Sequence, residues 1–323
     1  MKLAVRAPAT SANLGPGFDC LGLALDLWAA VTVETVRSAS GQEQGAPRLV
    51  RQGIAAAFEG VGKAPAVSVA WDGAIPIARG LGASAALRAA GLLAGNALLN
   101  SVHSTEALLE MGTKLEGHPD NMAPCLFGGF QISVRKSSDA HAPGFNLGSA
   151  QSETLVHLEA PLPADLKVVL FVPDFEMPTQ ESRRRLPRQL SREDAVFNAG
   201  RTALLVAALA AGRYDLLDEA TQDRIHQPAR AEIFKGLAPI MAAAKEAGAA
   251  AAYLSGGGST VAAFVEEPAH PEALEGRAEP APPGPAERVA RLMTQAAIAH
   301  GFSGRSIITR PTAQGAHIGE PRS

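Results

Sequence analysis

The chain has 323 residues and a formal net charge of −3, with 46% hydrophobic and 19% charged residues. This length suits two domains, and the hydrophobic fraction can fill a large interior, so global disorder is excluded. No long lysine or arginine run stands out, which argues against nucleic acid and anionic membranes as main partners.

The cysteine content and the start of the chain indicate the compartment. Cys20 and Cys125 are the only cysteines and form no CxxC spacing, which favours a reducing compartment and excludes a structural zinc site. The first residues lack the apolar segment of a secretory signal, and no apolar run reaches the roughly 18 residues of a membrane span. We therefore expect a soluble, cytoplasmic protein.

The first half of the chain shows strand and helix patterns separated by glycine-rich or polar loops. Pro8 is expected to end the first strand, and residues 37–48 are expected to form a polar loop. Ser104 is a candidate helix cap, and Gly117 a helix end. The expected strands cover residues 2–8, 21–36, 67–73 and 125–134, and the expected helices cover residues 84–99 and 104–116.

The second half mixes strands and helices in the same irregular way. Ser191 is expected to cap a helix that closes on Gly212. Residues 268–288 are rich in proline, alanine and glutamate, which indicates a surface insertion. Further strands are expected over 166–174, on both sides of a glycine turn within 250–265, and over 305–311, the last of them. Helices are expected over 236–248 and 287–301.

The order of these elements predicts the fold class. Strands and helices do not alternate regularly, so two α+β layers are favoured over a doubly wound sheet. We place the boundary before the strand that begins at residue 166, giving domains of residues 1–160 and 161–323.

The stretch GLGASAAL, residues 80–87, leads into an apolar helix. The first backbone N–H groups of a helix are unpaired, and its dipole favours an anion there. Gly80 and Gly82 lack the Cβ atoms that would keep a ligand away from the backbone, and Ser84 offers a hydroxyl to a metal or phosphate. Because the lysine of a Walker loop is missing, the stretch alone favours a tight turn over a phosphate loop.

The stretch LEGHPDN brings Glu116, His118, Asp120 and Asn121 together at a helix end. Magnesium prefers carboxylate and hydroxyl oxygens, so a carboxylate beside a phosphate loop would hold the metal of ATP. Glu116 is the better metal candidate, because Glu110 would face another way. A capped helix end with solvent-facing polar groups is an equally good interpretation of the spacing.

Other motifs offer polar or cationic side chains. Asn13 and Asp19 lie in the loop ATSANLGPGFD, Thr179 and Arg183 in PTQESRRRLP, and Arg230 in IHQPAR. A guanidinium binds a carboxylate bidentately. A structural turn and solvated helix faces are the simpler interpretations, and the turn LSGGGSTV fits a hairpin as well as a ligand contact. The chain has neither a G-x-S-x-G elbow nor a complete GxGxxG dinucleotide motif.

Taken together, five motifs in a fixed order resemble a known family. PATSANLGPGFDCLGLAL, GLGASAA, EGHPDNMAPCLFGGF, PTQESRRRLP and LSGGGSTV follow one another between residues 8 and 261. In these motifs the chain resembles the homoserine kinase family of the GHMP small-molecule kinase superfamily. The pair SANLGPGFD and EGHPDN carries the narrower resemblance.

The resemblance implies a two-domain GHMP kinase fold. An N-terminal α/β-sandwich-like domain would supply the ATP loop, a ferredoxin-like domain would follow, and the active site would lie between them. The implied reaction transfers the γ-phosphate of ATP to the hydroxyl of L-homoserine, giving O-phospho-L-homoserine for threonine synthesis. A homodimer is consistent with the family.

The resemblance also implies roles for individual residues, with ATP as co-substrate and Mg²⁺ as metal. The metal ligands would be Ser84 and Glu116, and the residues counted as catalytic would be Asp19, Ser84, Glu116 and Thr179. Homoserine would be bound by Asn13, Asp19, His118, Asn121, Arg183 and Arg230. ATP would be bound by Arg79, Gly80, Leu81, Gly82, Ala83, Ser84, Ala85, Gly256, Gly257 and Gly258.

Two departures from the family pattern bear on catalysis. Ala83 replaces a serine of the usual GLGSS loop, and Asn121 stands where some relatives carry a general-base aspartate. We therefore expect catalysis by positioning and charge neutralisation, with the hydroxyl proton passing to the phosphate and Asp19 as the alternative base. A GHMP kinase for another small alcohol, or a relative that binds nucleotide without turnover, stays an alternative.

Overall fold

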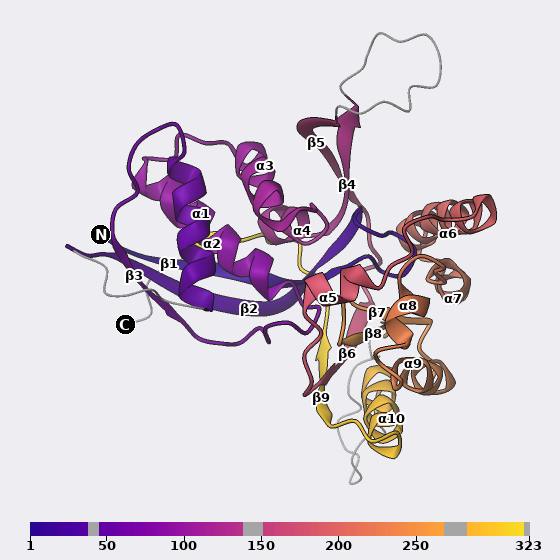
Figure 1. Cartoon of the computed structure of the whole chain (residues 1–323). Coiled ribbons are helices and arrows are strands. Elements are labelled where there is room, and N and C mark those ends of the chain that lie inside the picture. Colours follow the sequence, from indigo (N-terminus) through magenta and orange to yellow (C-terminus); the bar gives the residue numbers. More distant parts are fainter. Residues whose placement is uncertain (38–44, 138–150, 268–282, 320–323) are drawn as a thin grey trace, which may run out of the picture.

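The computed structural model describes residues 1–37, 45–137, 151–267 and 283–319, except for the side chains at 137, 151–154, 179 and 180. Two sheets organise these residues, and every strand pairing among them is antiparallel. Figure 1 shows the first sheet under the N-terminal helices and the second sheet beside it. The predicted α+β organisation is confirmed.

The first sheet has the strand order β10-β1-β2-β4-β5, with β3 paired to β2. The helices formed by residues 46–127 lie along one of its faces (Figure 1). The strands are β1 (Lys2–Ala12), β2 (Leu21–Thr35), β3 (Val67–Trp71), β4 (Phe130–Ser137), β5 (Gln151–Ala160) and β10 (His317–Gly319). The helices are α1 (Ala46–Phe58), α2 (Ala83–Leu98), α3 (Thr105–Glu116) and α4 (Met122–Phe127).

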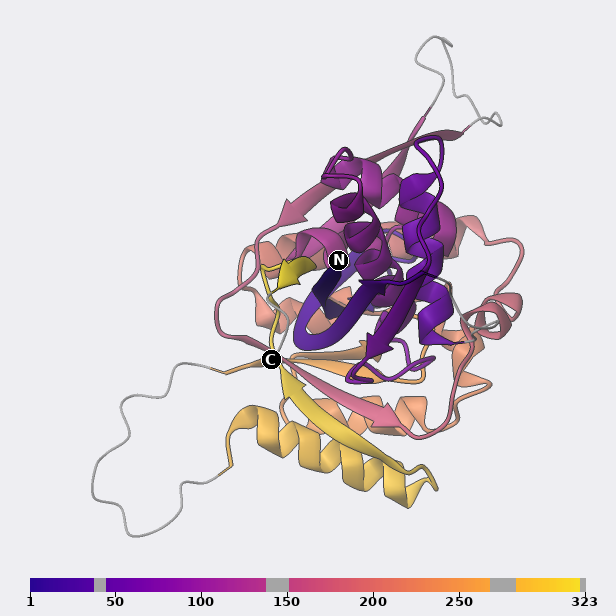
Figure 2. The same ribbon diagram turned by 90° about the vertical axis from the view of Figure 1, so that its left-hand side faces the viewer.

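The second sheet has the order β7-β8-β6-β9 and is covered on one face by two helices. Figure 2 shows α10 running beneath β6 and β9. Its strands are β6 (Leu166–Pro173), β7 (Ala251–Leu254), β8 (Val261–Glu266) and β9 (Gly304–Thr309), and its helices are α9 (Leu237–Glu246) and α10 (Pro285–Ala299). Between β6 and α9 lie α5 (Thr179–Arg184), α6 (Arg192–Ala210), η1 (Tyr214–Leu216), α7 (Leu217–Ala220) and α8 (Gln227–Ala231).

Strand β6 is buried on both faces and joins the two halves of the molecule. Val168, Leu170 and Val172 belong to a core shared with the first sheet, α6 and α7. Val169 and Phe171 point the other way, into the core under α9 and α10. This double burial explains why residues 168–173 form a continuous apolar run. The predicted boundary after residue 160 falls in the connection between β5 and β6 and stays a prediction.

Helix capping was predictable, because it depends on local chemistry. The Ser104 side chain accepts a hydrogen bond from the backbone N–H of Ala107, and Gly117 ends α3 in the left-handed conformation. Ser191 likewise accepts from the N–H of Asp194 at the start of α6. The predicted helices 84–99, 104–116, 236–248 and 287–301 are confirmed with small shifts of their ends.

Several predictions for the first half were wrong. Pro8 does not end the first strand: β1 continues to Ala12, and its register with β2 shifts between Pro8 and Ala9, where a bulge tolerates a residue without an N–H. Residues 125–127 belong to helix α4, so the strand begins only at Phe130. The predicted loop 37–48 lies partly outside the described residues, and its end already forms the start of α1.

Several elements had no counterpart in the sequence-based expectations, among them α1, β5, α7, α8 and β10. Helix α1 packs against α2 where glycines allow close contact: a Cβ on Gly91 would lie 2.0 Å from the Val50 carbonyl oxygen. Strand β10 follows the strand expected to be last and pairs with β1, with Val5 opposite Ile318. Most of the insertion 268–288 lies outside the described residues, and α10 begins at its end.

None of the helices formed by the described residues is long and apolar enough to cross a membrane.

Candidate functional site

A pocket lies where the beginning of α2, the end of α3, the loop after β1 and the turn between β7 and β8 meet. Loops and helix ends that connect the strands of both sheets therefore contribute to it. The lining residues are Asn13, Ala78, Arg79, Gly80, Leu81, Gly82, Ala83, Ser84, Ala85, Glu116, His118, Asp120, Asn121, Arg183, Arg230, Gly256 and Gly257.

The predicted phosphate loop forms the tip of α2. Gly82 is the N-cap residue and adopts a left-handed conformation with φ 66°, and Gly80 has φ 75°. The first backbone N–H groups of α2, at 83–85, have no acceptor within the helix, as at any helix start. These amides lie in the pocket wall and carry the positive end of the helix dipole, which suits an anion.

The structure adds a second reason for these glycines, while the predicted approach of a ligand to their backbone stays a prediction. A Cβ on Gly82 would lie 1.9 Å from Thr10 Oγ1, and a Cβ on Gly80 would lie 2.2 Å from the Ser255 carbonyl oxygen. The missing Cβ atoms therefore make room for neighbouring protein atoms, as well as permitting the positive φ angles. The tip of α2 can therefore pack closely against β1 and against the turn after β7.

Ser84, in the first turn of α2, contacts Glu116, at the end of α3. Ser84 Oγ donates a hydrogen bond of 2.8 Å to Glu116 Oε1, and both residues line the pocket, whereas Glu110 does not line it. A hydroxyl and a carboxylate are the hard oxygen donors that Mg²⁺ prefers. The two residues therefore fit a magnesium ion that keeps several of its waters.

Asp19 and Arg183 come together from distant parts of the chain. The Arg183 guanidinium donates bidentately to the Asp19 carboxylate, with Nη1 2.9 Å from Oδ2 and Nη2 bound to Oδ1. Burial acts to lower the pKa of Arg183, but the hydrogen bond and charge of Asp19 outweigh it, and the pKa is raised. Arg183 lines the pocket, whereas Asp19, its partner in this ion pair, is not among the lining residues.

His118, Asp120 and Asn121 form one hydrogen-bonded group. His118 Nδ1 is bonded to Asp120 Oδ1, which also accepts from Asn121 Nδ2 at 3.2 Å. Burial acts to lower the pKa of His118, but the charge and hydrogen bond of Asp120 outweigh it and raise the pKa. Asn121 Oδ1 accepts from the Thr10 hydroxyl at 2.8 Å, so both ends of this amide are engaged.

Oxygen and nitrogen atoms of Asp19, His118 and Asp120 lie within 4.8 Å of one another, as in some metal sites. Arg183 already neutralises Asp19, and His118 is bonded to Asp120. These contacts make the cluster a hydrogen-bonded network rather than a second set of metal ligands.

Arg230 is the most deeply buried cation of the pocket, with 1% of its surface exposed. Its Nη1 lies 2.9 Å from the Gly256 carbonyl oxygen and 2.7 Å from His226 Nδ1, and its Nε donates to Ser182 Oγ at 2.9 Å. Burial and then the charge of Arg183 lower the pKa of Arg230 to about 10, so it stays protonated at neutral pH. No described carboxylate forms an ion pair with it.

His226 holds Arg230 in place as a neutral group. Burial first, and then the charge of Arg230, lower the pKa of His226 to about 4, although Asp223 acts to raise it. The neutral ring can donate from Nε2 to the Gly15 carbonyl oxygen at 2.7 Å and accept from Arg230 at Nδ1. His226 thus links the loop after β1 to the pocket arginine.

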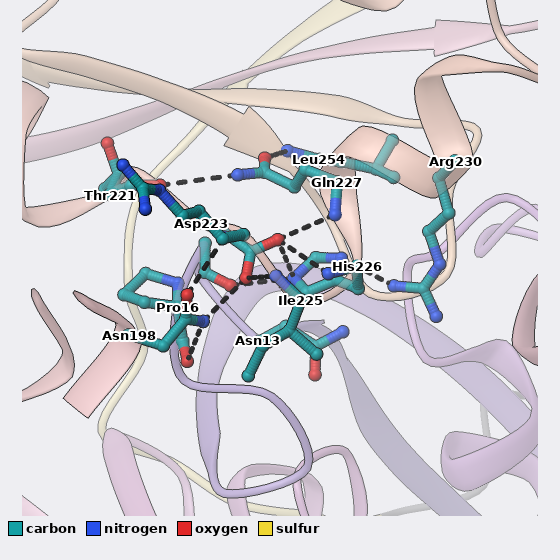
Figure 3. Close-up of polar contacts among 12 residues, drawn as sticks. Asn13, Pro16, Asn198, Thr221, Asp223, Ile225, His226, Gln227, Arg230 and Leu254 are labelled. Atoms are coloured by element: carbon teal, nitrogen blue, oxygen red, sulfur yellow. Dashed lines mark hydrogen bonds and ion pairs between the residues drawn. The ribbon is translucent and has the colours of Figure 1, made fainter. Parts of the chain in front are cut away.

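Sequence reasoning missed His226 and its support, Asp223, which Figure 3 shows. The Asp223 carboxylate accepts from the backbone N–H groups of the next turn, Ile225, His226 and Gln227, at 2.9, 2.9 and 2.6 Å. It also accepts from Asn198 Nδ2 at 2.7 Å. The available signal was an aspartate four residues before the start of a short helix, a place where a carboxylate can accept hydrogen bonds from the backbone N–H groups that follow it.

The remaining predicted residues have different outcomes. Gly256 and Gly257 line the pocket, whereas Gly258 does not. Asn13 Nδ2 donates to the Gly256 carbonyl oxygen at 3.0 Å, which connects the two glycine-containing loops. Thr179 begins α5, and its side chain lies outside the described residues.

Comparison with known proteins gives consistent matches. Residues 48–129 match the family described as GHMP kinases N terminal domain, and residues 205–280 match GHMP kinases C terminal. A homoserine kinase from Desulfitobacterium hafniense is 36% identical over 324 residues, covering 97% of this chain and 99% of that protein. One from Deinococcus radiodurans is 41% identical over 273 residues, covering 81% and 84%.

Solved structures show the same likeness. A crystal structure of homoserine kinase from Cytophaga hutchinsonii has a TM-score of 0.79 at 26% identity and covers 98% of this chain and 97% of its own. The mevalonate kinase of Methanococcus jannaschii shares the fold, with a TM-score of 0.61 at 11% identity over 97% of this chain and 99% of its own.

Proposed function

This chain belongs to the homoserine kinase family of the GHMP kinases, and from that premise we propose how it transfers the γ-phosphate of ATP to the hydroxyl of L-homoserine. It is an ATP-dependent small-molecule kinase with a two-domain, mixed α+β fold. The observation that carries the residue-level proposal is the buried Arg230 guanidinium, which lines the pocket and is bonded only to neutral groups.

An arginine held in this way calls for an anionic ligand. A buried charge without a counter-ion is costly, and a carboxylate can engage a guanidinium through two parallel hydrogen bonds. We assign the carboxylate of homoserine to Arg230, with Arg183 near enough to add its field. Asp19 then serves to orient Arg183 and to attract the substrate ammonium group, with Asn13, His118 and Asn121 completing the polar wall.

The opposite side of the pocket suits the triphosphate. The backbone N–H groups at the tip of α2 would bind phosphate oxygens, with residues 79–85 forming the rim and Gly256 and Gly257 facing them. Ser84 and Glu116 would hold Mg²⁺, which when bound neutralises phosphate charge. Ala83 offers no hydroxyl, so Ser84 is the hydroxyl ligand of this loop.

No described carboxylate is both free of a partner and placed to take the proton of the homoserine hydroxyl. Asp19 is engaged by Arg183, Asp120 by His118, and Glu116 by Ser84. Transfer of the hydroxyl proton to the departing γ-phosphate keeps the reaction balanced without a protein base: the new O–P bond forms as the bond to ADP breaks. The enzyme then contributes by aligning the two substrates.

The test is ADP release measured in parallel with L-homoserine, L-serine, mevalonate and galactose, with and without magnesium. Of the four alcohols, we expect only homoserine to support ADP release, and only when magnesium is present. Release with mevalonate or galactose instead would assign a different alcohol, and ATP binding without any release would indicate a binding protein.

For the setting of the enzyme we propose the cytoplasm and a homodimer, with neither nucleic acid nor membrane as partner. The composition supports the cytoplasm and the absence of nucleic-acid and membrane partners. Light scattering of the purified protein tests the homodimer.

A further inference from the structure

Arg88 contacts both residues assigned to the metal. It lies on α2, one turn after Ser84, and its Nη1 donates to Ser84 Oγ at 2.9 Å and forms an ion pair with Glu116 Oε1. Its Nε and Nη2 donate to Gln52 Oε1 on α1 at 3.2 and 3.1 Å. The Arg88 and Glu116 side chains are only 16% and 10% exposed, so solvent screens this pair weakly.

A count of hydrogen bonds shows what these residues still offer. The single Ser84 hydroxyl proton points to Glu116, and one of its lone pairs accepts from Arg88, which leaves one lone pair. Glu116 Oε1 receives both donors, while the described residues provide no donor to Oε2. One serine lone pair and one carboxylate oxygen therefore remain for a cation without displacing Arg88.

The charges at this place cancel before any ligand arrives. Glu116 contributes one negative charge, and Arg88 contributes one positive charge in direct contact with it. A divalent cation entering alone meets a neutral pair and is repelled by the guanidinium, an interaction that is strong at these distances. A triphosphate brings several negative charges to the same place and reverses the balance.

We propose that Arg88 makes the metal site dependent on nucleotide: it suppresses binding of free divalent cations and leaves Ser84 and Glu116 to the metal–nucleotide complex. The inference rests on the proposed function, which assigns these two residues to the metal. Arg88 does not line the pocket, so it acts through Glu116 and the local field rather than by touching the substrate.

The experiment measures Mn²⁺ binding from the electron paramagnetic resonance signal of the free ion, without nucleotide. We expect Arg88→Met and Arg88→Gln to bind Mn²⁺ about tenfold more tightly than the unaltered protein, because each removes the competing charge. Arg88→Lys keeps the charge and should stay near the unaltered protein. Arg213→Met, which removes a surface partner of Asp215, is the matched control and should change nothing.

The same titrations are repeated with a non-hydrolysable ATP analogue. The difference between Arg88→Met and the unaltered protein should shrink to about twofold or less, because the phosphates now dominate the local charge. Circular dichroism of each variant checks folding, and the glutamine variant, which keeps hydrogen-bond donors, serves if the methionine variant unfolds.

Two outcomes would overturn the inference. If the neutral variants bind free Mn²⁺ no better than the unaltered protein, Arg88 only orients Glu116. If their advantage persists undiminished with nucleotide, the dependence on nucleotide is absent. Glu116→Gln separates these failures from failure of the proposed function: if it binds metal normally with nucleotide present, the assignment of Glu116 itself is wrong.

Discussion

The two ends of the pocket recognise charge in different ways. At the nucleotide end, residues 80–85 with Arg88 and Glu116, recognition depends on backbone amides and on an ion pair whose charges cancel. At the homoserine end, Arg230 with His226 and Asp223, it depends on a buried cation held by neutral side chains and one backbone oxygen. One end can accept a highly charged ligand together with its own metal. The other is organised in advance for a single carboxylate.

This difference makes the two ends separable by mutation. Changes at the homoserine end should affect homoserine and leave ATP binding unchanged, and changes at the tip of α2 should do the reverse. The following predictions test that separation, from the largest expected effect to the smallest.

Replacing Arg230 by methionine should have the largest effect. The variant loses the cation assigned to the substrate carboxylate, so kcat/KM for homoserine should fall about a thousandfold, the range for losing a buried charged partner. Steady-state kinetics with each substrate varied in turn measure this, and the affinity for ATP should stay within about twofold. Arg184→Met, at an exposed position near the same pocket, is the control. An equal loss of ATP affinity would contradict the separation.

The homoserine end should also be the acid-sensitive one. The pKa of His226 is about 4 in the folded chain and about 6.5, the ordinary value for histidine, in the unfolded chain, so the folded state binds fewer protons between these values. The contribution of neutral His226 to the free energy of unfolding is therefore fully present above about pH 6.5 and is lost as the pH falls toward 4, by about 3 kcal/mol in total. Urea unfolding from pH 7 to 4 measures this. His226→Gln should flatten the dependence, and an unchanged slope would show that other groups cause it.

At the nucleotide end, Gly82→Ala tests the contact with β1. The new Cβ would lie 1.9 Å from Thr10 Oγ1 at a positive φ, so we expect a loss of about 2–3 kcal/mol in unfolding free energy and weaker ATP binding. Gly60→Ala is the matched control, because Gly60 has φ 74° with open space around it and should lose only about 1 kcal/mol. Equal losses at both positions would remove the steric argument.

Asp19→Asn should have the smallest effect and sharpens the view of the homoserine end. With Arg183 less well oriented, KM for homoserine should rise about tenfold while the shape of the pH–rate profile is retained. Kinetics over a range of pH measure both. If the rate of the unaltered enzyme falls as the pH is lowered and the rate of the variant does not, Asp19 is the base.

Features that depend on local chemistry were predictable from the sequence. Ser104 and Ser191 cap their helices because a hydroxyl reaches an amide three residues away, whatever the rest of the chain does. The glycines and Ser84 at the tip of α2 are neighbours in sequence and so were easily recognised as one motif. Most residues expected around the ligands, from Asn13 to Arg230, do line one pocket.

Features that depend on partners far away in the sequence were not predictable. Arg88 is visible as the residue four positions after Ser84, but its pairing with Glu116 requires α3 to lie beside α2. Asp19 offered no sign that Arg183, 164 residues later, would neutralise it. Helix α1 was missed because its contact with α2 cannot be read from the sequence: Gly91 lies within the predicted helix 84–99, and only the folded chain shows that it makes room for the Val50 carbonyl oxygen.

The return of β10 to β1 has a consequence for synthesis of the chain. β1 is synthesised before β10, so its outer neighbour, residues 317–319, is added only after the other strands of both sheets. Until then that edge of β1 offers unpaired amides and carbonyls to any extended peptide nearby. A ribosome-bound chain that has not yet reached residues 317–319 should therefore be prone to aggregation and to chaperone binding, and synthesis of β10 closes the edge.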